Sequence, residues 1–145
     1  MSKLLERAQA MLRGEEPDPP VARLLGFRIV EVAPGRAVFE MEAGPQHANP
    51  MGTLHGGILC DIADAAMGIA YASTLEEGES FTTLELKINF LKPVWKARLR
   101  AEGRIVKRGK TVGMVACDVV DETGSLVARA SSTCLTLAGK KAEGR

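Results

Sequence analysis

The chain has 145 residues, of which 46% are hydrophobic and 26% charged, and its 19 basic residues nearly balance 18 acidic ones. This length and composition predict one domain whose core is large enough to fold without metal or disulfide support. The net charge of +1, the scarcity of aromatic residues and the lack of a basic stripe exclude a nucleic-acid-binding surface.

The segment 1–19 is predicted to form a helix and a linker. Apolar side chains recur with helical spacing over residues 3–13, and Gly14 follows as a typical helix end. An acidic, proline-rich linker comes next, and residues 20–25 fit a short helical turn. No continuous apolar run resembles a signal peptide or a membrane span, so we expect a cytoplasmic protein.

Residues 20–138 are expected to form the folded domain, and residues 139–145 a charged tail. Apolar side chains alternate over residues 27–32 and 37–41, which predicts two strands joined by a turn. A long loop rich in Gly and Pro follows, and then a helix over residues 57–73 that is rich in Ala and Gly. Asp61, Asp64 and Gly68 lie on one side of this helix, opposite a broad apolar face formed by Ile58, Leu59, Ile62, Ala66, Ile69 and Ala70. Small residues on several sides of this helix indicate close approach by other backbone.

Four further strands are predicted after the helix. In the first, the run from Leu84 to Phe90 alternates apolar residues with polar ones, and this alternation places Thr83 on the polar face. The neighbouring Thr82 leaves the register open by one residue, and a slip of one would move the side chain to the other face. Residues 97–107, 111–120 and 126–137 form the others, and tight turns between them make the sheet antiparallel. The pattern predicts an α+β fold, in which an antiparallel sheet wraps around one long central helix.

Three cysteines, Cys60, Cys117 and Cys134, lie far apart in apolar stretches. Their odd number and long spacing argue against a disulfide framework and against a zinc site. We expect buried, unpaired thiols in a reducing compartment, and no metal site.

The most informative segment is the loop that delivers His55-Gly56-Gly57 into the start of the long helix, with Asp61 and Asp64 beyond it. The first N–H groups of a helix have no intrahelical partner and lie at the positive end of its dipole. Such groups can stabilise an oxyanion, and a carboxylate can activate water, so two parts of an acyl-transfer site are present. On the residues alone, the glycines equally fit a sharp turn, and a solvated helix face is the favoured interpretation of Asp64.

The order of elements resembles the hot-dog fold, and the motif resembles the acyl-CoA thioesterases of the phenylacetate pathway (PaaI-like) type. The matching residues are Asn49-Pro50, Gly52, His55-Gly56-Gly57, Ala63-Asp64 and Lys87-Ile88-Asn89-Phe90-Leu91-Lys92-Pro93. The resemblance covers residues 20–137. It implies a hydrolase that converts an acyl-CoA thioester to a free acid and CoA, with aryl-acetyl groups favoured and short or medium chains left open.

The resemblance also implies roles for five residues. The Gly56 N–H would polarise the thioester carbonyl, and Asp64 would act as general base or as nucleophile. Asn49 would help place the thioester, His55 would orient the loop and substrate, and Thr83 would hold the attacking water with Asp64. The residues alone leave plainer alternatives open, namely an Asx turn at Asn49, a loop-ordering hydrogen bond at His55 and an ordinary strand position at Thr83.

A basic hairpin, Arg108-Gly109-Lys110, suits the phosphates of coenzyme A, although basic surface turns are common. No metal or redox cofactor is expected, since coenzyme A is part of the substrate, and His47 is expected to be structural. In the family, the loop glycine of one subunit faces the aspartate of its partner. We therefore expect at least a homodimer, and a homotetramer as the complete assembly.

Two other functions remain open from the sequence. One is a hot-dog dehydratase or hydratase acting on 3-hydroxyacyl thioesters, which would use His55 as a proton shuttle. The other is a protein of the same fold that binds acyl-CoA without turnover.

Overall fold

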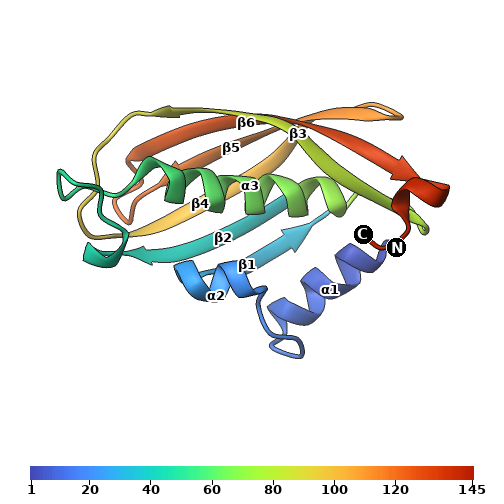
Figure 1. Ribbon diagram of the computed structural model, residues 1–145, viewed down its shortest axis with the longest axis horizontal. Helices are drawn as coiled ribbons and strands as arrows, with labels where there is room; N and C mark the ends of the chain where they lie inside the picture. Colours follow the sequence, from blue (N-terminus) through green and yellow to red (C-terminus); the bar gives the residue numbers. More distant parts are fainter.

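The computed structural model describes residues 1–145, and its centre is a six-stranded antiparallel sheet curved around the helix α3 (Gly56–Ala72) (Figure 1). The strands are β1 (Phe27–Ala33), β2 (Arg36–Ala43), β3 (Glu79–Phe90), β4 (Ala97–Arg108), β5 (Val112–Val120) and β6 (Leu126–Ala138). They lie in the order β1-β2-β4-β5-β6-β3, so β1 and β3 are the two edges. The predicted α+β class and the hot-dog architecture are confirmed.

Both helices predicted before the first strand are present. They are α1 (Lys3–Leu12) and α2 (Pro20–Leu25), and both contact the edge strand β1. The loop after β2 contains a short 3₁₀ helix, η1 (Pro45–His47), and the charged tail contains another, η2 (Gly139–Ala142), which contacts β3 and β6. The longest helix has 17 residues, and no helix combines the length and apolar character that crossing a bilayer demands.

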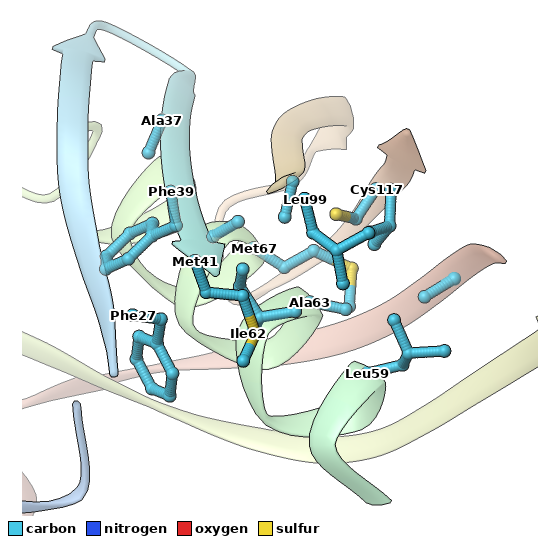
Figure 2. Packing of buried hydrophobic residues seen from close by; sticks show 14 of the residues in the cluster. Phe27, Ala37, Phe39, Met41, Leu59, Ile62, Ala63, Met67, Leu99 and Cys117 are labelled. Carbon is cyan, nitrogen blue, oxygen red and sulfur yellow. The ribbon is translucent and has the colours of Figure 1, made fainter. Parts of the chain in front are cut away.

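The sheet buries more of α3 than the predicted apolar face. Figure 2 shows Ile62, Ala63 and Met67 of α3 packed among side chains of the sheet, including Met41 and Leu99. Six more residues of the helix are also buried: Leu59, Ala66, Gly68, Ala70, Tyr71 and Ala72. The predicted face included Ile58 and Ile69, which are only half-buried. The difference arises because a curved sheet surrounds most of the helix circumference, and small residues such as Ala63 let the strands approach.

Gly103 of β4 lies directly against the backbone of α3. A Cβ atom at this position would lie 2.4 Å from the carbonyl oxygen of Ala66 and 2.7 Å from the nitrogen of Met67. Both are backbone atoms of α3, so a methyl group here would push the helix away from the strand.

We therefore expect Gly103→Ala to lower the free energy of unfolding by about 1–3 kcal/mol, the usual cost of overpacking a core. Chemical denaturation followed by circular dichroism measures this change. Gly44→Ala is the matched control, because the atoms nearest its Cβ belong to the flexible end of the Gln46 side chain. Equal stability of the two variants would contradict this account of the contact.

A bulge in β3 corrects one sequence prediction. The pairing with β6 shifts between Thr83 and Glu85, so Leu84 is an extra residue and is 56% exposed. One inserted residue reverses the alternation of faces. The predicted alternation placed Thr83 opposite the apolar run that includes Leu86, and this was wrong. Thr83 pairs with the buried Cys134 and turns its side chain toward α3.

Candidate active site

The start of α3 presents one unused backbone donor. His55 is the N-cap residue, and its Nδ1 accepts a hydrogen bond from the Gly57 N–H at 2.9 Å. The neutral ring therefore carries its proton on Nε2. No hydrogen bond within the chain uses the Gly56 N–H. This N–H group lies at the positive end of the helix dipole, where it can receive an oxyanion.

Asn49 organises the loop that leads into α3. Its Oδ1 accepts hydrogen bonds from the N–H groups of Met51 at 2.9 Å and Thr53 at 3.2 Å, and its Nδ2 donates to Thr53 Oγ1 at 2.8 Å. The Asx turn left open by the sequence is therefore present. One of the two Nδ2 hydrogens is not used within the chain and can serve a ligand.

Asn49 and Gly56 line the same cavity. This space of about 370 Å³ is also bordered by Leu59 and by the segment from Phe90 to Val94. The Phe90 ring lies directly over Gly56, where a Cβ atom would come within 2.7 Å of the ring. A side chain at position 56 would have to displace this exposed ring, whereas Gly56 borders the cavity without doing so.

His47 is structural, as the sequence predicted. Its Nδ1 accepts a hydrogen bond from the Gly44 N–H at 3.2 Å, and its Nε2 lies 2.7 Å from the carbonyl oxygen of Leu25. Because Nδ1 is an acceptor, Nε2 is the donor. The buried ring thus fixes the loop before α3 to the end of α2.

Asp64 and Thr83 face each other from α3 and β3. The Thr83 hydroxyl donates a long hydrogen bond of 3.4 Å to Asp64 Oδ1. Burial of the Asp64 carboxyl raises its pKa above the ordinary value, Thr83 lowers it, and the negative charge of Asp61 raises it further. A carboxylate with a raised pKa is a stronger base once ionised, and a hydroxyl beside it can help to hold a water molecule.

This pair lies in a second cavity, of about 300 Å³, whose walls are mostly apolar. The lining residues from the sheet and from α3 are Phe27, Ile29, Phe39, Phe81, Asp61, Ala65, Gly68 and Ile69. The sequence placed Gly68 on the same side of the helix as Asp61 and Asp64, and the structure confirms this. The four strand residues Phe27, Ile29, Phe39 and Phe81 were not recognised as cavity residues, because strand alternation marks a residue as inward without showing whether it packs or lines a space.

Gly56 and Asp64 do not meet within one chain. They are eight residues apart on a single helix, which separates them by about 12 Å along its axis. A reacting carbonyl must lie about 3 Å from its oxyanion donor and close to the water that the base activates. The structure therefore brings Asn49 together with Gly56, and Asp64 together with Thr83, in two separate cavities.

The basic hairpin is not brought to either cavity within the chain. The Arg108 guanidinium lies 4.7 Å from the centre of the Tyr71 ring, donates to Thr74 Oγ1 at 3.2 Å and approaches Glu79 at 3.9 Å. These contacts are at the end of α3 opposite to Gly56, while Lys110 is exposed. The phosphate-binding role of residues 108–110 stays a prediction.

The cysteines are unpaired, and two of them are buried as predicted. Burial raises the pKa of Cys117 to about 12 and also raises the pKa of Cys134. Cys60 is only half-buried, which differs from the prediction. No three His, Cys, Asp or Glu side chains come together in an arrangement that could hold a metal ion.

Comparison with known proteins identifies the family. Residues 51–128 match the thioesterase superfamily. Acyl-coenzyme A thioesterase 13 of Homo sapiens is 31% identical over 117 residues, which cover 77% of this chain and 81% of that protein. The 1,4-dihydroxy-2-naphthoyl-CoA hydrolase of Listeria monocytogenes is 32% identical over 117 residues, covering 81% of this chain and 93% of that one.

Among solved structures, the PaaI protein from the phenylacetic acid degradation operon of E. coli aligns with a TM-score of 0.81 and 25% identity. That alignment covers 94% of this chain and 98% of PaaI. The fold, the motif and the relatives agree with one another. The chain therefore belongs to the thioesterase superfamily, among the PaaI-like hot-dog proteins, and is a thioester hydrolase.

Proposed function

We propose that the enzyme hydrolyses acyl-CoA thioesters at a site shared between two subunits. The observation that carries this proposal is the pair of complementary half-sites, a free N–H at Gly56 and a carboxylate at Asp64 that lies at the second cavity beside the Thr83 hydroxyl. One supplies an oxyanion donor and the other a base, and neither completes a site without the other.

In the proposed reaction, the acyl group enters the apolar cavity beside α3, and the carbonyl oxygen accepts a hydrogen bond from Gly56 N–H of the other subunit. Asn49 contributes its free amide hydrogen. Asp64, with the Thr83 hydroxyl, removes a proton from water as the water attacks the carbonyl carbon. CoA then leaves as a thiolate, which is a fair leaving group because a thiol has a pKa of roughly 8.5.

The alternative is direct attack by Asp64 to form a mixed anhydride. Label found in Asp64 after a single turnover in isotopically labelled water would establish the anhydride route. Attack by water leaves the Asp64 carboxylate unlabelled, whereas hydrolysis of an anhydride at its aspartyl carbon places the label in Asp64.

The edge strand β3 supports the dimer. It has 12 residues, no partner on its outer side, and apolar side chains at Leu84 and Phe90 that are 56% and 55% exposed. A long apolar edge is a template for pairing with another strand. We propose that two copies of β3 pair, which brings the partner's α3 close to this one.

The outer face of the sheet supports a further pairing of dimers. Near β1, β2 and β4 this face carries ion pairs, in which Arg36 bridges Glu31 and Glu102. Near β5 the same face instead exposes Val112 and Met114 beside a shallow hollow. We propose that the apolar half is the contact that makes a homotetramer. The three unpaired cysteines support a location in the reducing cytoplasm.

Release of free thiol from a panel of acyl-CoAs, from phenylacetyl to palmitoyl, tests the function. We expect turnover of phenylacetyl-CoA and of short and medium chains. Tight binding without thiol release would instead show a non-catalytic acyl-CoA-binding protein.

The alternative function of hydratase is tested by replacing His55. We expect His55→Asn to retain most of the thioesterase activity, because asparagine is also a good N-cap and keeps α3 intact. A proton shuttle could not survive this change, since the amide does not titrate. Hydration of crotonyl-CoA, measured beside thiol release, separates the two functions, and loss of both activities in a folded variant would favour the hydratase.

A further inference from the structure

The cavity that holds Asp64 is closed on one side by the N-terminal part of the chain. Met11 of α1, Asp18 and Pro19 of the linker, and Val21 and Ala22 of α2 all line it. The remaining walls come from α3 and from strands β1, β2 and β3 of the same chain. The N-terminal segment therefore borders the space that receives the acyl group in the proposed reaction.

The N-terminal segment that forms this wall, residues 11–22, is held in place by contacts of α1 with the rest of the chain. The Ser2 hydroxyl donates a hydrogen bond of 3.1 Å to the carbonyl oxygen of Ala72, and both residues are buried. Ala8 is completely buried, and α1 contacts both α3 and β1 (Figure 1). The Ser2 hydrogen bond holds the start of α1, and Ala8 holds the helix one turn before Met11.

The linker is stiff where it meets the cavity. Asp18 lies between Pro17 and Pro19, and Pro20 opens α2. Proline rings fix their own backbone angle and restrict the preceding residue. Ala22 is buried, and Gly26, with a φ of 87°, ends α2 and directs the chain into β1. The wall cannot move outward without breaking these contacts.

The volume behind this wall is small. About 300 Å³ is at the lower limit for cavities that hold small molecules, and apolar side chains make up most of its lining. Such a space suits an aromatic ring or a chain of moderate length better than a long acyl chain.

We propose that residues 11–22 set the size limit for the acyl group, with Met11 as a specificity-determining residue. The substrate class is then aryl-acetyl and short-to-medium-chain acyl-CoA. This inference rests on the proposed function, since it assigns the cavity to the acyl group. The half-buried Met11 side chain is the wall residue whose truncation removes most volume without touching the linker prolines.

The test is the dependence of kcat/KM on acyl length for the full-length enzyme and Met11→Ala. We expect the variant to gain at least about tenfold for chains two to three carbons longer than the wild-type optimum, because each additional buried methylene contributes roughly fourfold. Leu12→Ala is the matched control, since Leu12 is 40% exposed on the same helix and does not line the cavity.

Dissociation constants for the same acyl-CoAs, measured with the wild-type protein and both variants under conditions without turnover, give a second readout. A wild-type enzyme that releases no thiol would refute the proposed function, while the dependence of binding on acyl length would still decide the role of Met11. An unchanged order of acyl preference in folded Met11→Ala would overturn the inference. So would the same shift in Leu12→Ala, because it would show general loosening of α1.

Discussion

Replacing Asp64 with alanine is expected to lower kcat for acyl-CoA hydrolysis by at least about 10²-fold, the lower limit for loss of a general base. Asp64 supplies the only carboxylate that the structure pairs with Thr83, and it lies at the apolar cavity. Thiol release under saturating substrate measures kcat directly. Asp61→Asn is the comparison, because Asp61 lines the same cavity one turn earlier on α3 but has no hydroxyl partner.

The pH profile tests the assignment independently. Asp64 acts as a base only when ionised, so activity should fall as the pH drops through its pKa, which lies above the ordinary value of about 3.9. The negative charge of Asp61 raises this pKa, so Asp61→Asn should move the acidic limb to lower pH. The Thr83 hydrogen bond lowers it, so Thr83→Val should move the limb to higher pH.

These opposite shifts are a signature that a purely structural role would not give. If Asp61→Asn lost as much activity as Asp64→Ala, with no displacement of the limb, the assignment of the base to Asp64 would be wrong. If the acidic limb of the pH profile were the same in Asp64→Ala as in the wild type, the base would likewise not be Asp64.

The order and type of the elements could be predicted because the hydrophobic period changes clearly along the chain. Apolar residues recur with helical spacing up to Gly14, alternate from Phe27 onward, and return to helical spacing after Gly57. Each change coincides with a Gly- or Pro-rich segment. The strong agreement over α3 reflects its length, since chance rarely sustains a helical pattern over 17 residues.

The face of Thr83 could not be predicted, for a physical reason. The bulge residue Leu84 is apolar, so it continues the alternation of apolar and polar residues by one position. The sequence pattern therefore gives no sign that the side chains change faces at this point. A bulge is set by pairing with the neighbouring strand, and the sequence of β3 alone does not show that pairing. Only the pairing of Thr83 with Cys134 reveals that its hydroxyl faces Asp64.

The contacts of Arg108 also could not be predicted from the sequence. A cation in a glycine-containing turn fits a phosphate site equally well whether or not the side chain is already engaged. In the fold, Arg108 lies over Tyr71 and contacts Thr74, both distant in sequence. Contacts of this kind depend on which end of α3 the β4–β5 turn reaches, and this follows from topology rather than from local composition.

The separation of the two half-sites has the largest consequence for function. Since Gly56 and Asp64 are held about 12 Å apart along a rigid helix, no side-chain rotation brings them to one carbonyl. A homodimer with two-fold symmetry solves this problem, because it can place the loop of each copy against the carboxylate of the other. Two active sites then form, and each depends on both chains.

Two inactive variants should therefore restore activity when mixed. One is Asp64→Ala, and the other is the double variant Asn49→Ala/Gly56→Pro, which removes both donors of the loop because proline has no N–H and is tolerated at the first position of a helix. Each removes one half-site from both active centres of its own dimer. In a mixed dimer, one centre combines the intact loop of the first chain with the intact Asp64 of the second. Random assortment makes half of the dimers mixed, so about one quarter of wild-type activity should return.

Activity is measured by thiol release after mild dissociation and reassociation, with the exchange of differently tagged chains followed by native mass spectrometry. Each variant must first show a wild-type circular dichroism spectrum and assembly size. Either variant carried alone through the same treatment is the control and should stay inactive. Full subunit exchange without recovery would show that each chain holds a complete site, and the distance between Gly56 and Asp64 on α3 would then require a different route for the thioester. Recovery near one quarter would instead assign each centre to two chains, with the carbonyl bound by one and the water activated by the other.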